Sequence, residues 1–120
     1  MDIENYREYC LAKPGVTEEL PFSPDTLVFK VMGKMFALTD IEKFVSINLK
    51  SDPEEAVRLR EQYPEVTPGY HMNKKHWNTV RMDGTLADSF VKELIDVSYN
   101  LVVDGLPKKV KAELQALGDQ

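Results

Sequence analysis

An alternation of apolar and polar side chains along residues 44–50 constrains the fold of this chain more than any other feature. Val45, Ile47 and Leu49 point to one side of an extended chain. The other side carries polar side chains, namely those of Ser46, Asn48 and Lys50. A strand of this kind has one face against a core and one face open. We therefore expect a sheet that is covered on one side only.

The residues on either side of this strand predict further antiparallel pairing. Leu27, Phe29 and Val31 alternate with Thr26, Val28 and Lys30, and after a turn at Gly33, Phe36 and Leu38 alternate with Met35 and Ala37. Residues 76–82 predict another strand, in which core-facing Val80 and Met82 would place Trp77, Thr79 and Arg81 on the opposite face. If these strands share one sheet, its open face carries cations, amides, hydroxyls and one large ring.

Helices are expected around the strands. The first covers residues 3–12, with Asp2 as its N-cap, and Asp52-Pro53 begins a second that ends at Pro64. The longest spans residues 86–104, and a last short helix follows Pro107. The buried stripe of the longest helix is predicted to consist of Phe90, Leu94, Val97 and Leu101. This order of elements predicts an α+β fold, an antiparallel sheet with helices packed mainly on one face.

Composition says more about the size and location of the protein than about its function. The 120 residues predict a single domain over positions 1–120, and no apolar run reaches the length of about 18 residues that a membrane span needs. The start of the chain does not resemble a signal peptide. The single cysteine, Cys10, fits a reducing cytoplasm and lies on the apolar stripe of the first helix, so we expect it to be buried and inert.

The net charge of -5 argues against a molecule that attracts DNA over its whole surface, but the charge is uneven. Residues 66–82 carry three basic side chains, both histidines, the only tryptophan and no acid. Cations, amides and aromatic rings in this mixture can contact phosphates and bases. The predicted nucleic-acid or ligand site combines residues of this segment with three from the strands: Tyr70, His71, Asn73, Lys74, Lys75, His76, Trp77, Asn78 and Arg81, with Lys30, Asn48 and Lys50. The alternative is a solvated hairpin tip that Trp77 anchors in the core.

Catalytic and metal sites are not expected from the sequence. His71 and His76 stand five residues apart, so in a strand they would lie on opposite faces. Nucleophile, phosphate-loop and dinucleotide motifs are lacking, and the adjacent acids Glu54 and Glu55 suit the start of a helix. We therefore predict a protein that is not an enzyme and uses no cofactor.

Several segments, taken in order, resemble the MmcQ/YjbR family. They are residues 14–19, 21–22, 25–31, 33–38, 48–54, 68–80, 95–102 and 106–109, of which residues 68–80 match the family's most distinctive run. The resemblance implies a two-layer fold similar to that of frataxin (CyaY-like). It also implies DNA binding through a double-wing arrangement, and it supplies no catalytic residues.

Three functions remain open at this point. The first is DNA binding through a basic sheet face and hairpin, with asparagines and aromatic rings near the bases. The second is a non-enzymatic module that binds a small molecule or a protein with the same face. The third, by analogy with frataxin alone, is iron binding through Glu4 and Glu8.

Overall fold

The computed structural model describes residues 1–69 and 72–118. The described residues form α1 (Ile3–Leu11), β1 (Val16–Glu19), β2 (Thr26–Val31), β3 (Lys34–Asp40), β4 (Ser46–Lys50), α2 (Pro53–Gln62), β5 (Val66–Pro68), β6 (Trp77–Arg81), α3 (Asp88–Asp104) and α4 (Lys108–Gly118). None of the helices in these residues is long and apolar enough to cross a membrane.

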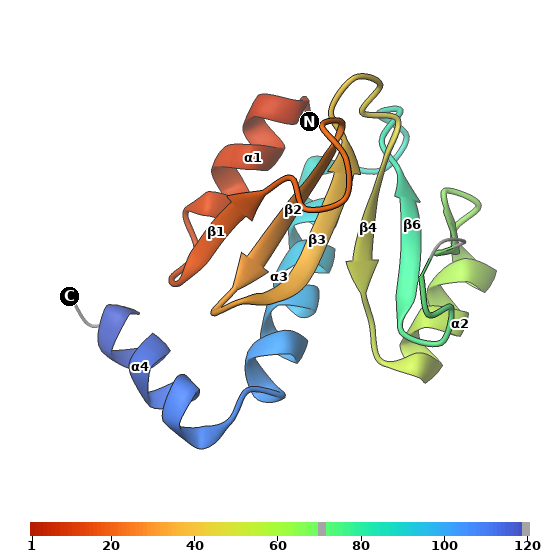
Figure 1. The fold of residues 1–120 in the computed structure, drawn as a ribbon. Helices are drawn as coiled ribbons and strands as arrows, with labels where there is room; N and C mark the ends of the chain where they lie inside the picture. The colour runs from red at the N-terminus through yellow and green to blue at the C-terminus, as the bar shows by residue number, and fades with distance from the viewer. Residues whose placement is uncertain (70–71, 119–120) are drawn as a thin grey trace.

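The six strands form one antiparallel sheet in the order β1-β2-β3-β4-β6-β5. Figure 1 shows α3 running behind this sheet, where it contacts β2, β3 and β4. Helix α1 packs near β1, and α2 packs near β5 and β6. The chain therefore has the predicted α+β fold. Strands β1 and β5 were not predicted, because each is a short edge strand; β5 ends at Pro68, where the sequence indicates only a turn.

A two-residue turn joins β2 to β3. Met32 and Gly33 both have positive φ angles, 49° and 84°, and lie between the paired residues Val31 and Lys34. Two successive positive φ angles define the hairpin turn whose twist matches that of the strands. The predicted hairpin is therefore present, and Gly33 takes the backbone conformation that an L side chain resists.

A β-bulge in β3 overturns the predicted faces of that strand. The register passes from the pair Phe29–Ala37 to the pair Lys30–Met35, so Phe36 is an extra residue opposite β2. Phe36 and Ala37 are both buried in the helix-side core, while Met35 and Leu38 both lie on the open face. The simple alternation of Phe36 and Leu38 against Met35 and Ala37 is therefore wrong.

The core lies between the sheet and the helices. Tyr6 of α1 meets Phe29 of β2 edge to face, with ring centroids 5.4 Å apart. Cys10 is fully buried, as expected, and burial raises the pKa of its thiol to about 12, which keeps it protonated at neutral pH. The Asp2 side chain accepts a hydrogen bond from the amide of Asn5 and caps α1 as predicted.

The buried stripe of α3 differs from the predicted one. It consists of Val91, Ile95, Ser98 and Val102, whereas Val97 is 45% exposed. The observed stripe lies one residue further along the chain than the predicted one and includes a polar residue, Ser98. Its hydroxyl donates to the Phe36 carbonyl at 2.5 Å and accepts from the Lys50 amide at 2.8 Å, bridging β3 and β4 where their pairing ends.

Candidate functional site

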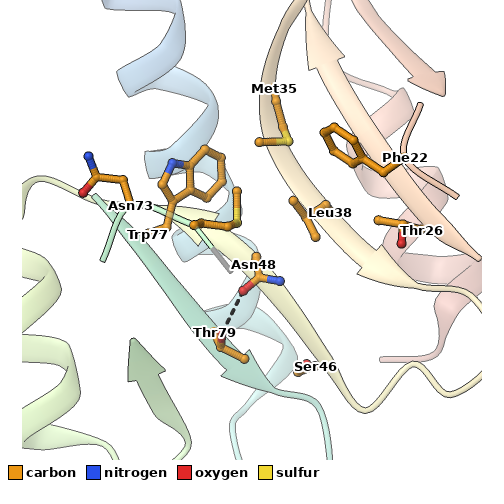
Figure 2. Close-up of a pocket in the computed structure, with 10 residues that line it drawn as sticks. Phe22, Thr26, Met35, Leu38, Ser46, Asn48, Asn73, Trp77 and Thr79 are labelled. Carbon is orange, nitrogen blue, oxygen red and sulfur yellow. Dashed lines mark hydrogen bonds between the residues drawn. The ribbon is translucent and has the colours of Figure 1, made fainter. Parts of the chain in front are cut away.

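The open face of the sheet contains a groove of about 790 Å³. Its floor is a row of three side chains on adjacent strands, in which Asn48 of β4 pairs with Leu38 of β3 and with Thr79 of β6. Figure 2 shows the groove between the side chains of β3 and those of β6. The described residues that line it are Phe22, Thr26, Met35, Leu38, Ser46, Asn48, Met72, Asn73, Trp77 and Thr79.

Trp77 begins β6 and forms one wall of the groove. The residue is only 9% exposed, yet it does not belong to the core between sheet and helices. The chain around it is fixed by backbone hydrogen bonds, from Gly69 to the Trp77 carbonyl at 2.9 Å and from Trp77 to the Asn73 carbonyl at 2.9 Å. A side chain at position 69 would meet Trp77 at 3.1 Å, so glycine permits this close approach. Trp77 is thus both well packed and directed to the groove.

A hydrogen bond on the floor orients the amide of Asn48. The Thr79 hydroxyl donates to Asn48 Oδ1 at 2.7 Å, so the amide nitrogen points the other way, toward Leu38 (Figure 2). At the rim, Asn73 Oδ1 accepts from the amide of Lys75 at 2.9 Å. The carbonyl ends of both asparagines are therefore occupied by the protein itself.

All described residues that line the groove are uncharged. They combine aromatic, methionine and leucine side chains with a few amides and hydroxyls, which is the composition of a site for a small organic molecule. The volume also falls within the range of about 300–1,000 Å³ that such sites occupy. Among the described residues, three or more metal-ligating side chains do not gather anywhere in the arrangement that would hold a metal ion.

The predicted cations do not form one basic face. Lys30 on β2 pairs with Glu19 at 2.8 Å, and Arg81 on β6 pairs with Asp83 at 2.5 Å. Lys50 lies opposite Trp77, four residues along the strand pair from Arg81, which corresponds to about 13 Å. The sequence could not reveal this separation, because it depends on strand order and on acids from neighbouring segments.

Lys74 and Lys75 line a different depression from the groove. Together with Pro53, Glu54, Val57 and Arg60 they line a shallow depression beside α2, and the Arg60 guanidinium donates to the Lys74 carbonyl at 3.2 Å. The contiguous patch expected for Lys30, Lys50, Lys74, Lys75 and Arg81 is therefore not formed.

Two other predicted site residues also lie outside the groove lining. Asn78 follows Trp77 in β6 and points to the opposite face, where it is 1% exposed and donates to the Ala56 carbonyl of α2 at 3.2 Å. His76 is half-buried, and its carbonyl accepts from the amide of Ser51 at 2.7 Å. Tyr70 and His71 lie outside the described residues. Of the predicted site, Asn48, Asn73 and Trp77 line the groove.

Several residues of the groove were not predicted as site residues. Ser46 and Thr79 were placed on the open face by alternation, whereas Phe22, Thr26, Met35, Leu38 and Met72 were not considered. Met35 and Leu38 share this face only because of the bulge at Phe36. Phe22 lies in the loop between β1 and β2 and is 71% exposed, which is unusual for a large apolar side chain at the rim of a cavity.

Comparison with known proteins identifies relatives over almost the whole chain. The model of the YjbR family matches residues 11–101. Two proteins of Escherichia coli named as uncharacterised are similar: YbdF of strain O157:H7 is 42% identical over 107 residues, 88% of each chain, and YjbR of strain K12 is 37% identical over 118 residues, 98% of this chain and all of the relative.

Solved structures agree with the sequence relatives. The crystal structure of the Deinococcus radiodurans protein DR2400, with a domain called DUF419, is 42% identical and superposes with a TM-score of 0.88, covering 94% of this chain and 87% of that one. The crystal structure of a Pseudomonas syringae protein is 32% identical, with a TM-score of 0.72 and coverage of 84% and 98%. The similarity therefore extends to the arrangement of the whole sheet.

Proposed function

The chain belongs to the YjbR family, and we propose that it is a non-enzymatic binding module that holds an uncharged small organic molecule in the groove on its open sheet face. One observation carries this proposal: the groove is large, it is built from several strands and loops, and its described lining is apolar with a few neutral hydrogen-bonding groups. Such a lining favours an uncharged ligand, because a buried charge without a partner costs several kcal/mol.

The same lining argues for binding rather than catalysis. General acid–base and nucleophilic mechanisms need a titratable or activated side chain within hydrogen-bond reach of the reacting atoms. None of the described lining residues titrates near neutral pH, and the buried Cys10 lies in the core behind the sheet.

DNA binding, which the family resemblance implies, is the competing function. It would need cations on a common surface to contact successive phosphates. Lys30 and Arg81 are paired with acids, and Lys50 stands apart from Arg81. Lys74 and Lys75 with Arg60 form a small basic group beside α2, so a DNA contact would use that side of the molecule rather than the groove.

The fluorescence of Trp77 provides a direct test, because it is the only tryptophan of the chain. We expect neutral two- and three-ring heterocycles to change its emission with saturation, because Trp77 forms the wall of the groove. The Leu38→Glu variant, which puts a charge on the floor, should bind at least about tenfold more weakly. Val97→Glu is the matched control, since Val97 is exposed on α3 behind the sheet.

DNA is tested in parallel by fluorescence anisotropy with a labelled duplex at about 50 mM and about 200 mM salt. We expect ligand binding that Leu38→Glu weakens at least about tenfold and Val97→Glu preserves. The proposal is wrong if no heterocycle perturbs Trp77 while the duplex binds, with a steep salt dependence, equally well to the protein and to Leu38→Glu.

A further inference from the structure

We infer that the groove selects a flat, uncharged ring system that bears a carbonyl acceptor, with the ring against Trp77 and the carbonyl oxygen at the amide nitrogen of Asn48. This inference rests on the proposed function, because it names the ligand class for the same groove. Three features of the described residues lead to it: the direction of one amide, the nature of the walls and the spacing of the strands that carry them.

The polar group that the floor offers is a hydrogen-bond donor. The Thr79 hydroxyl has two acceptors in reach, Asn48 Oδ1 at 2.7 Å and the Pro68 carbonyl at 3.4 Å, and the shorter bond assigns its single proton to Asn48, so no proton is left for a ligand. The same bond occupies the carbonyl of Asn48 and turns its amide nitrogen toward the interior of the groove (Figure 2). A ligand carbonyl satisfies this donor, whereas an amine or ammonium placed at the Asn48 nitrogen would meet another donor there and leave both unsatisfied.

The walls suit a flat ring. Trp77 on one side presents a largely buried indole, and Met35 on the other side comes from β3, the strand that also carries Leu38 of the floor. Aromatic faces and thioether sulfurs both make favourable contacts with aromatic rings. Strands β3 and β6 are separated by β4, so their backbones are about 10 Å apart, a span that suits a fused two- or three-ring molecule better than a single ring.

The rim of the groove carries an exposed aromatic side chain on the side away from Trp77. Phe22 is 71% exposed and lies across the groove from Trp77 in Figure 2. A ring bound between them would cover apolar surface of Phe22 that is now open to solvent, which adds favourable free energy to binding. The groove is thus closed by Trp77 and the floor, and open where the Phe22 loop passes.

The test uses two probes that differ in the acceptor. Coumarin has two fused rings and a lactone carbonyl, and naphthalene has two fused rings and no polar atom. Each is titrated into the full chain while the single indole N–H signal of Trp77 and the side-chain amide signals of Asn48 are followed by NMR. We expect coumarin to bind at least about fivefold more tightly, since one hydrogen bond to a half-buried donor is worth about 1 kcal/mol. Only coumarin should shift the Asn48 amide protons.

Asn48→Asp provides the matched variant. It keeps the oxygen that accepts from Thr79 and replaces the NH₂ donor by a second acceptor. Coumarin affinity should fall by about five- to tenfold more than naphthalene affinity, because the added charge weakens both probes and the lost donor weakens coumarin alone. Asn100→Asp, which adds the same charge at an exposed position of α3, should leave both affinities as they are. The wild-type titration tests the inference even if Asn48→Asp does not fold.

The outcomes separate this inference from the proposed function. Equal affinity for coumarin and naphthalene, with no shift at Asn48, overturns the carbonyl inference and leaves a groove that binds rings. No shift of the Trp77 signal with either probe overturns both.

Thymine bases in single-stranded DNA share the chemistry of a flat ring with carbonyls, so a thymidine decamer is titrated against free thymidine at about 50 mM and about 200 mM salt. Similar affinities for the decamer and for free thymidine, unchanged between the two salt concentrations, support a small-molecule ligand. Much tighter, salt-dependent binding of the decamer through Asn48 would overturn the small-molecule source and assign the ring to nucleic acid.

Discussion

Polar side chains on the two faces of the sheet differ in how fully the protein itself satisfies their hydrogen bonds. On the helix-covered face, the buried hydroxyls of Thr39 and Ser98 each bind backbone: Thr39 donates to the Ser46 carbonyl at 2.8 Å, and Ser98 bridges β3 and β4. On the open face, Asn48 is held by Thr79 through its oxygen, which leaves its amide nitrogen for a ligand. Burial alone therefore does not identify the binding site. The distinguishing feature is a positioned donor for which the described residues provide no acceptor.

The boundary between the two faces passes through the bulge in β3. Met35 and Phe36 are neighbours in sequence, yet Phe36 is fully buried against the helices and Met35 lines the groove. Because the bulge adds one residue to β3, it shifts the pattern of the strand and moves Met35 and Leu38 to the same side. One inserted residue thus supplies the apolar wall of the groove.

The largest expected effect comes from truncating these neighbours one at a time. Phe36→Ala should lower the free energy of unfolding by about 3–5 kcal/mol, because it empties a fully buried aromatic site where the ring meets Tyr99 edge to face. Met35→Ala should cost much less stability and should instead weaken ligand binding in the groove. Urea denaturation and ligand titration of both variants check the division. Similar losses of stability in the two variants would show that the faces are not energetically distinct.

The next effect concerns the hydroxyl that joins β3 to β4. Ser98→Ala removes the donor to the Phe36 carbonyl and the acceptor for the Lys50 amide, both in the buried layer. Leaving these backbone groups without a partner should cost about 1–3 kcal/mol in urea denaturation. Ser89→Ala, near the start of the same helix and exposed, is the control and should change stability by less than about 0.5 kcal/mol. If Ser98→Ala changes the free energy of unfolding as little as Ser89→Ala does, water replaces the hydroxyl and stability does not depend on the hydrogen bonds of Ser98.

The regular parts of the fold could be read from the sequence, and the irregular parts could not. Alternation in β4 and β6 predicted correctly that Asn48 and Thr79 lie on the open face, because strands without bulges keep a period of two, whereas the sequence left Trp77 open between this face and the core. The same rule failed at Phe36, since an extra residue leaves no trace in composition. Helical periodicity failed in a similar way in α3, where a serine occupies a core position and binds two backbone groups.

The site was harder to predict than the fold, for the same reason. Charge in the sequence pointed to residues 66–82, but pairing with acids and strand order, which depend on the whole chain, decide where a cation acts. Lys30 and Arg81 illustrate this, because their partners are Glu19 of the neighbouring strand β1 and Asp83, which follows β6. Phe22 reaches the groove by the path of a loop, for which no periodic signal exists.

The smallest expected effect is a pH dependence of stability that arises only on the helix-covered side of the sheet. Asp96 of α3 accepts hydrogen bonds from Tyr9 at 2.6 Å and from Lys13 at 2.5 Å, which fasten α1 to α3. Partial burial raises the pKa of the Asp96 carboxyl, but the hydrogen bonds from Lys13 and Tyr9 outweigh it and hold the pKa below its ordinary value. A lowered pKa in the folded state means stabilisation that is present above the unfolded pKa of about 3.9 and is lost as the pH falls through the folded pKa.

Asp96→Asn should therefore be less stable than the native chain at neutral pH, and the difference should shrink as the solution is acidified below about pH 4. The Asp96 side chain is 41% exposed, so solvent screening limits the difference to about 1 kcal/mol or less. Urea denaturation at a series of pH values measures it, with Asp104→Asn, at an exposed position of the same helix, as the control. A stability difference that persists unchanged into acid would mean that Asp96 acts by packing rather than by charge. Asp96→Asn should leave the ligand affinity unchanged at every pH, because the α1–α3 contact and the groove lie on opposite sides of the sheet.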